Sequence, residues 1–215
     1  MRINRYLALK KYATRRGADK LIEAGLVTIN GQLAKIGETI KEGDRVEVRQ
    51  IKKPEIYTYL AYHKPRGAIT SSPLPGLFPL GRLDKDSSGL LLLTDDGRIT
   101  DRLLNPEHAH EKEYVVTTRE PLRSNFVRQM SAGVDIGDYV TRPCQVIIIN
   151  DRSFRIILTD GKKHQIRRMC AALRVDVTEL TRVRIMNIRL GQLAAGTHRP
   201  LTAPELSTLL KNLGL

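Results

Sequence analysis

Apolar residues near the N-terminus recur at the spacing of two short helices. The inward-facing positions of these helices are Ile3, Tyr6, Leu7, Ala18, Leu21 and Ile22. Thr14 stands before the second set, where a side-chain hydroxyl can cap the start of a helix. Gly25 stands after it, where a residue with positive φ commonly ends one. The pattern therefore predicts two helices, with the second lying between Thr14 and Gly25.

Short strands are predicted after these helices. Residues 26–29 are apolar or β-branched, and the Asn30-Gly31 pair that follows them is a strong signal for a tight hairpin turn. Residues 39–40 and 46–48 form a second expected strand pair around an acidic turn. The first 50 residues thus predict a small unit of two helices followed by short strands.

The longer remainder of the chain predicts strands and helices in irregular order. Strands are expected at residues 56–62, 90–93, 114–118, 146–149 and 154–158, and helices at 98–104, 122–130, 161–173 and 204–213. Because the two kinds of element do not alternate regularly, we expect an α+β fold around a mostly antiparallel mixed sheet. A short polar stretch ending at Pro54 predicts domains at residues 1–50 and 56–215, joined by a linker at 51–55.

The chain of 215 residues carries 36 Lys and Arg against 23 Asp and Glu, a formal charge of +13. Residues 1–53 hold +7 of that charge, so the N-terminal unit is densely basic and suited to the phosphates of a nucleic acid. No run of about 18 apolar residues occurs, so a membrane-spanning helix is not expected. Two cysteines and the lack of a signal-peptide pattern predict a cytoplasmic location.

Short segments of the N-terminal unit resemble the alpha-L RNA-binding motif. They keep the order of that motif over residues 1–49, and they are residues 2–7, 14–19, 23–27, 29–31 and 41–44. The resemblance implies that this unit binds RNA, and basic side chains beside its apolar positions are expected to contact phosphates. These side chains are Arg2, Arg5, Arg15, Arg16 and Lys20.

Residues 81–89, with the sequence Gly-Arg-Leu-Asp-Lys-Asp-Ser-Ser-Gly, place charged and hydroxyl side chains between two apolar segments. A loop in this position cannot expose all of them to bulk water. One interpretation is a turn whose Asp and Ser side chains bond their own backbone, and the other is a functional site. Composition alone favours neither interpretation.

The same loop, continued by the apolar residues 90–93 and Thr94, resembles the signature of the RsuA/RluA-type pseudouridine synthases. Other blocks similar to that family follow in the same order, namely residues 64–67, 112–114 and 161–169. Several segments are most similar to its RluF branch, namely residues 111–114, 130–134, 168–170 and 184–187. The resemblance extends over nearly the whole chain and implies an enzyme that isomerises uridine in RNA to pseudouridine.

The resemblance implies that Asp84 is the catalytic aspartate. Detaching uracil from its ribose and rejoining it through C5 requires neither a redox cofactor nor a metal, so neither is expected. A carboxylate that attacks C1′ or removes the C2′ proton must be ionised, whereas burial favours its neutral form. The resemblance assigns Arg167 as the cation that keeps Asp84 ionised.

The resemblance implies further roles. Tyr114 would stack on the target base, although a half-buried strand tyrosine requires no such role. Arg82 would fill the place that the flipped uridine leaves, and the alternative is a salt bridge to Asp84 or Asp86. Ile185 would pack beside the base, although core packing also explains it. The remaining residues expected to contact the substrate are Lys64, Arg168, Arg182 and Arg184.

The sequence therefore predicts an RNA pseudouridine synthase that acts on large-subunit (23S) ribosomal RNA, as the RluF branch implies. Two alternatives stay open. One is the same reaction on a transfer RNA stem-loop, and the other is a ribosome assembly factor that binds ribosomal RNA without catalysis. RNA is the expected partner, and a monomer is expected because no oligomerisation signal is visible.

Overall fold

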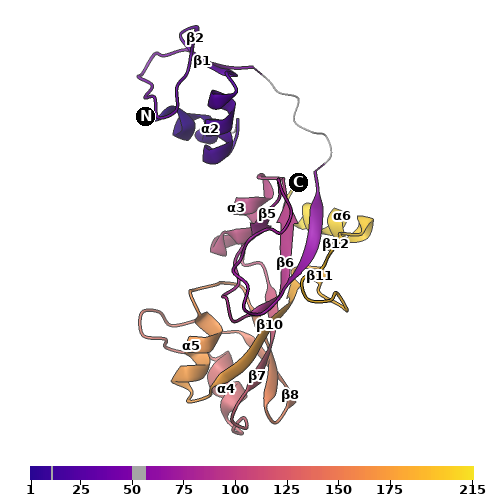
Figure 1. Cartoon of the computed structure of the whole chain (residues 1–215). Coiled ribbons are helices and arrows are strands. Elements are labelled where there is room, and N and C mark those ends of the chain that lie inside the picture. The colour runs from indigo at the N-terminus through magenta and orange to yellow at the C-terminus, as the bar shows by residue number, and fades with distance from the viewer. Residues whose placement is uncertain (11, 50–56) are drawn as a thin grey trace. The chain divides into compact units, whose positions relative to one another are not determined.

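The computed structural model describes residues 1–10, 12–49 and 57–215. The chain divides into two compact units, Met1–Tyr57 and Thr58–Leu215 (Figure 1). Each unit has a hydrophobic core of its own. The expected linker at residues 51–55 lies outside the described residues.

The N-terminal unit packs two helices against a small antiparallel sheet with the strand order β2-β1-β3. Its elements are α1 (Ile3–Leu9), α2 (Arg15–Glu23), β1 (Val27–Ile29), β2 (Gln32–Leu33) and β3 (Val46–Val48). The Thr14 hydroxyl accepts a hydrogen bond from the Gly17 amide, which confirms the predicted helix cap. Asn30 and Gly31 both have positive φ, as the predicted hairpin turn requires.

The expected pairing of residues 39–40 with 46–48 is wrong. β3 pairs with β1 instead, and Thr39 forms an isolated bridge to Arg2. The hairpin partner β2 occupies one edge of β1 and leaves the other edge open. Pairing at that open edge brings Val46 and Val48 against the core formed with the two helices, which buries more apolar surface.

The C-terminal unit is built on a nine-stranded sheet with the order β12-β4-β6-β10-β7-β9-β8, to which β5 and β11 add at β6 and β10. Its strands are β4 (Tyr59–Lys64), β5 (Phe78–Leu80), β6 (Ser88–Thr94), β7 (Lys112–Thr118), β8 (Gln145–Asn150), β9 (Ser153–Leu158), β10 (Val177–Ile185), β11 (Ile188–Arg189) and β12 (His198–Pro200). Within the described residues its strand pairs are antiparallel except β6 with β10, so the expected α+β fold is confirmed.

Helices cover parts of this sheet. They are α3 (Ile99–Leu104), the 3-10 helix η1 (Pro106–His108), α4 (Phe126–Ser131), α5 (Gln165–Ala172) and α6 (Ala203–Asn212). α4 and α5 pack on the same face of the β7–β9 region, where Phe126 and Met169 join Phe154 in the core (Figure 1). α5 begins four residues later than the predicted start at Gly161, so residues 161–164 belong to the loop that connects β9 with α5.

The sequence pattern did not predict β10, although this nine-residue strand joins the two halves of the sheet. Residues 177–185 mix charged and apolar side chains, so no apolar run marks the strand. Its charged groups find partners on the neighbouring strands. Arg184 pairs with Glu113 on β7, and Arg182 donates a hydrogen bond to the Leu90 carbonyl on β6.

β6 lies at the centre of the sheet, and its predicted apolar run, residues 90–93, is buried on both faces. Gly89 at the start of this run has a φ of +112°. A Cβ atom at this position would stand 2.3 Å from the carbonyl oxygen of Arg182. Glycine therefore allows β6 to approach β10 this closely, which brings the preceding loop next to Arg182.

Candidate active site

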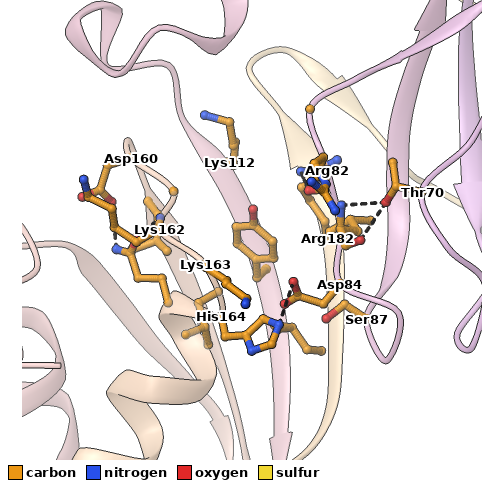
Figure 2. Close-up of a pocket in the computed structure, with 18 of the residues that line it drawn as sticks. Thr70, Arg82, Asp84, Ser87, Lys112, Asp160, Lys162, Lys163, His164 and Arg182 are labelled. Carbon is orange, nitrogen blue, oxygen red and sulfur yellow. Dashed lines mark hydrogen bonds and ion pairs between the residues drawn. The ribbon is translucent and has the colours of Figure 1, made fainter. Parts of the chain in front are cut away.

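A pocket of about 790 Å³ opens in the C-terminal unit between the loop of residues 81–87 and the segment before α5. Figure 2 shows Arg82 and Asp84 on one side of it and Lys162 and His164 on the other. β7 contributes Lys112 and Tyr114 to the lining, and β10 contributes Arg182. The sequence block around Asp84 thus forms part of a large cavity rather than an isolated turn.

Hydrogen bonds from Thr70 and Gly67 to the loop backbone hold the loop that carries Asp84. The Thr70 hydroxyl donates to the Leu83 carbonyl at 2.7 Å and accepts from the Leu83 amide at 3.0 Å. The Gly67 amide donates to the Lys85 carbonyl at 2.8 Å. The loop is therefore held immediately before and immediately after Asp84.

Lys64 is buried beneath this loop, with 1% of its surface exposed. Its ammonium group donates to the carbonyls of Pro65, Lys85 and Ser87 at 2.9, 3.3 and 2.7 Å. Burial lowers the pKa of Lys64, and the negative charges of two nearby aspartates oppose that shift. Lys64 supports the loop from inside and does not line the pocket, contrary to the predicted substrate contact.

The carboxylate of Asp84 faces the ring of His164 across the pocket (Figure 2). Oδ1 of Asp84 lies 3.4 Å from Nε2 of His164, and 34% of the aspartate side chain is exposed. His164 has a φ of +54°, a left-handed conformation that residues other than glycine seldom adopt. Sequence analysis assigned no role to His164, because its place in a motif block did not reveal this backbone turn.

Arg167 does not pair with Asp84, contrary to the prediction. Its guanidinium donates to the backbone carbonyls of Asp86 at 3.0 Å and Val177 at 3.2 Å. It therefore ties α5 to the end of the Asp84 loop and to the start of β10. In the described part of the chain, the side chain that stands within 4 Å of the Asp84 carboxylate in an ion-pair geometry is the imidazole of His164 and not the guanidinium of Arg167.

β7 carries two pocket residues on one face. Tyr114 is partly buried, packs against both neighbouring apolar clusters and lines the pocket as expected. Lys112 precedes it by two residues, and its ammonium donates to the His110 carbonyl at 3.1 Å. Burial and the positive charge of Arg182 lower the pKa of Lys112, whereas Asp160 opposes that shift. Sequence analysis noted Lys112 only as part of a motif block.

Two of the arginines expected to contact the substrate form ion pairs within the C-terminal unit. Arg184 bonds Oε2 of Glu113 through Nε at 2.6 Å and Glu111 through Nη2 at 3.0 Å. Arg168 bonds the carboxylate of Asp138. These carboxylates neutralise the two guanidinium groups in this structure, and the expected contacts of Arg168 and Arg184 with the substrate stay a prediction.

Arg182 has a different environment from these arginines, with 2% of its surface exposed. Nε donates to the Leu90 carbonyl at 2.8 Å and Nη1 to the Arg82 carbonyl at 3.4 Å. Nη2 is buried without a hydrogen-bond partner in the described structure, and so is the hydroxyl of Ser87. Arg182 is thus largely enclosed, yet it lines the pocket, and its expected contact with the substrate stays a prediction.

Arg82 and Ile185 each had two interpretations. Arg82 is exposed at the pocket and forms no ion pair with the described residues, so the salt-bridge alternative is wrong. Ile185 is 2% exposed on β10 and does not line the pocket. Core packing therefore describes Ile185.

The basic residues predicted to contact RNA in the N-terminal unit are all exposed, and none forms an ion pair within the described ranges. They are Arg2, Arg5, Arg15, Arg16 and Lys20. Their charges are not neutralised by the protein, so they are available to an anionic partner.

Residues 1–10, 12–49 and 57–215 give little evidence of a metal site, a membrane-spanning helix or a reactive cysteine. In these ranges no group of three or more His, Cys, Asp and Glu side chains could hold a metal ion, and no helix is long and apolar enough to cross a membrane. Cys144 and Cys170 are free thiols, and burial raises the pKa of Cys170 to about 12. Cys170 is therefore not a nucleophile at neutral pH.

Comparison with known proteins defines the class of enzyme. Residues 58–172 match the family described as RNA pseudouridylate synthase, and residues 1–46 match the S4 domain. The chain belongs to the RNA pseudouridylate synthase family and carries an N-terminal S4 RNA-binding domain. It is therefore an isomerase with RNA as its substrate.

Similar proteins indicate to which branch of the RNA pseudouridylate synthase family the chain belongs. The chain is 40% identical over 228 residues to dual-specificity RNA pseudouridine synthase RluF of Escherichia coli (strain K12), covering 98% of this chain and 79% of that one. It is 34% identical over 232 residues to ribosomal small subunit pseudouridine synthase A of Pasteurella multocida (strain Pm70), covering 98% and 100%. A solved structure of a pseudouridylate synthase aligns over 97% of this chain and 99% of its own, with 32% identity and a TM-score of 0.72. The chain is thus of the RluF/RsuA type.

Proposed function

We propose that the chain converts a specific uridine of large-subunit (23S) ribosomal RNA to pseudouridine, with Asp84 as the group that reacts with the ribose. The observation that carries this proposal is the setting of Asp84. A loop held by Lys64 and Thr70 presents its carboxylate to a large pocket rich in cationic side chains. The similarity of several motifs to the RluF branch supports the ribosomal target.

The reaction proceeds in three stages. Asp84 attacks C1′ or removes the C2′ proton, and the N1–C1′ bond breaks with its electron pair passing to the uracil. The base then turns over and bonds C1′ through C5, while Asp84 either leaves C1′ with the electron pair of its ester bond or returns its proton to C2′. Finally C5 loses its proton and N1 gains one. Tyr114 lines the same pocket, where its ring can stack on the base, and the exposed Arg82 can fill the vacancy in the RNA.

Other RNAs are the second candidates. The E. coli relative is named for dual specificity and the P. multocida relative for the small ribosomal subunit, so transfer RNA and 16S ribosomal RNA are the substrates to compare. The exposed basic side chains of the N-terminal unit would bind phosphates in each case. Modification of these RNAs would take place in the cytoplasm.

The test is tritium release from 5-tritiated uridine in 23S, 16S and transfer RNA transcripts. We expect release from 23S ribosomal RNA, and a rate at least about 10³-fold lower for Asp84→Asn, since the amide neither attacks C1′ nor accepts a proton. RNA affinity should change little, because the shape of the side chain is kept. Asp86→Asn is the matched control, an exposed aspartate of the same loop that should retain activity.

Each outcome decides one part of the proposal. Release from transfer RNA or 16S RNA alone would keep the reaction and change the substrate. Release by Asp84→Asn at the unaltered rate would contradict the role of Asp84. Tight binding without release from free RNA would call for an assembled ribosomal precursor in the same assay. Failure with that precursor would favour the non-catalytic assembly factor.

A further inference from the structure

Two cations adjoin this pocket without a carboxylate partner. The hydrogen bond of the Lys112 ammonium is to the His110 carbonyl, and in the described ranges no carboxylate lies within 4 Å of it. Arg182 is 2% exposed, and its Nη2 is buried without a hydrogen-bond partner. Burial and the repelling charge of Arg182 lower the pKa of Lys112, and Asp160 only partly opposes that shift. Negative charge that arises beside them would offset both the burial of unpaired cations and the repulsion between the two groups.

The strand geometry relates Lys112 to the base-stacking position. Lys112 and Tyr114 are two residues apart on β7, so their side chains leave the same face about 7 Å apart along the strand. Arg182 stands opposite Tyr114 on β10. Figure 2 shows Lys112 at a different end of the pocket from Asp84. A uracil stacked on Tyr114, with its ribose at Asp84, would extend its polar edge toward Lys112.

The reaction creates negative charge on that base. When the N1–C1′ bond breaks, its electron pair stays with the uracil and spreads over N1, O2 and O4. A cation held in a half-buried site stabilises such charge more than water does, because the surrounding dielectric constant is lower. The charge develops only as the bond breaks, so the interaction stabilises the transition state more than the bound substrate.

We propose that Lys112 is a further catalytic residue that stabilises the detached uracil anion through an oxygen of the base, with the buried Arg182 reinforcing its field. This inference rests on the proposed function. Lys112 keeps its proton throughout. The anion uses an electron pair at C5 to form the C5–C1′ bond as Asp84 leaves C1′ or returns the proton to C2′, C5 then releases its proton to solvent, and N1 takes one up.

The test compares Lys112→Met and Lys112→Arg under single-turnover conditions, on the RNA that the tritium assay identifies. The target position carries uridine or 5-fluorouridine, and nucleoside mass spectrometry follows its loss. For Lys112→Met we expect the uridine reaction to slow about 100-fold, as for the loss of one charge-stabilising donor, with RNA affinity unchanged. The defect should shrink several-fold with 5-fluorouridine, because the more acidic base is a better leaving anion.

Two control variants sharpen this comparison. Lys112→Arg retains the charge and should recover part of the rate. Lys163→Met removes an exposed lysine that lines the same pocket, and should leave the ratio of the two substrates unaltered. This ratio is measured within one variant, so it does not depend on how much of that protein is folded.

Three results would overturn the role of Lys112. The first is an equal defect with uridine and 5-fluorouridine. The second is weaker RNA binding, with a salt dependence reduced by about one charge and an unaltered single-turnover rate, which would assign Lys112 to a phosphate. The third is full activity of Lys112→Met. If the unaltered protein acts on no RNA, the proposed function itself fails, and the two failures are thus distinguishable.

Discussion

Replacing Lys64 with methionine should loosen the Asp84 loop without altering the pocket wall. Methionine is also long and unbranched, so it can occupy most of the buried space. The substitution removes the three hydrogen bonds that the ammonium donates to the carbonyls of Pro65, Lys85 and Ser87. Lys85 and Ser87 belong to the Asp84 loop and Pro65 directly follows β4, so the change tests whether one buried cation fastens this loop to the end of β4.

The expected loss of stability in Lys64→Met is the difference between two opposing contributions. A hydrogen bond from a charged donor contributes about 1.5–3 kcal/mol, so three contribute roughly 4–9 kcal/mol. Burying the ammonium costs several kcal/mol, and the lowered pKa of Lys64 reflects that cost. We therefore expect Lys64→Met to lower the free energy of unfolding of the C-terminal unit by about 2–4 kcal/mol. Misplacement of the Asp84 carboxylate by about 1 Å would slow the reaction about 100-fold.

The assay is hydrogen exchange of peptides from residues 58–215 in increasing urea, which reports on this unit alone, together with single-turnover rates. Lys211→Met is the matched control, because Lys211 is exposed on α6, and its effect should stay within about 0.5 kcal/mol. RNA affinity should be retained by both variants. A loss below about 0.5 kcal/mol for Lys64→Met, or full activity, would refute the reasoning.

Lys64 also implies a pH dependence. Its pKa is lowered in the folded protein, so the unfolded chain binds this proton more tightly. The cost of burial is fully present below the folded pKa and declines as the pH rises toward the unfolded value near 10.4. The stability advantage of the unaltered protein over Lys64→Met should therefore grow in that range, and urea titrations at pH 7 and pH 9.5 measure it.

Two further substitutions test the packing and the charge pairing. Gly89→Ala should cost about 3 kcal/mol or more, because its Cβ would overlap the Arg182 carbonyl oxygen, whereas Gly191→Ala has open space and should cost about 1 kcal/mol in urea titrations. Arg199 lowers the pKa of Glu205 to about 2, so the stability from this pair is present above the unfolded value near 4.3 and lost as pH falls through about 2. Glu205→Gln should cost roughly 2–3 kcal/mol at pH 7, and a deficit that did not shrink from pH 5 toward pH 2 would contradict the pairing.

Local signals in the sequence predicted most of the N-terminal unit. The Thr14 cap and the positive φ of Gly25 and of Asn30-Gly31 all agree with the structure. A cap or a turn involves residues within a few positions of one another, so the local sequence contains nearly all of the determinants. The pairing of β3 with β1 was missed, because strands distant in sequence compete for one edge.

The motifs also predicted that Asp84 and Tyr114 share a site, and both line the pocket. Motif similarity did not predict the contacts of the surrounding charges. Arg167 bonds two backbone carbonyls rather than Asp84, and His164 stands at the carboxylate instead. The position of a guanidinium or a ring depends on where α5 begins and on the left-handed turn before it, which the apolar pattern does not record.

The sequence by itself determined the α+β class, the basic RNA-binding unit and the central apolar strand at residues 90–93. Only the tertiary structure decided that Lys64 is buried beneath the Asp84 loop and that Lys112 lies in the pocket with a single carbonyl as hydrogen-bond partner. The identity of a residue as lysine does not reveal whether water or protein surrounds its side chain. Its environment is decided by strand pairing between β4 and β6 and between β7 and β10, which brings distant carbonyls and charges together.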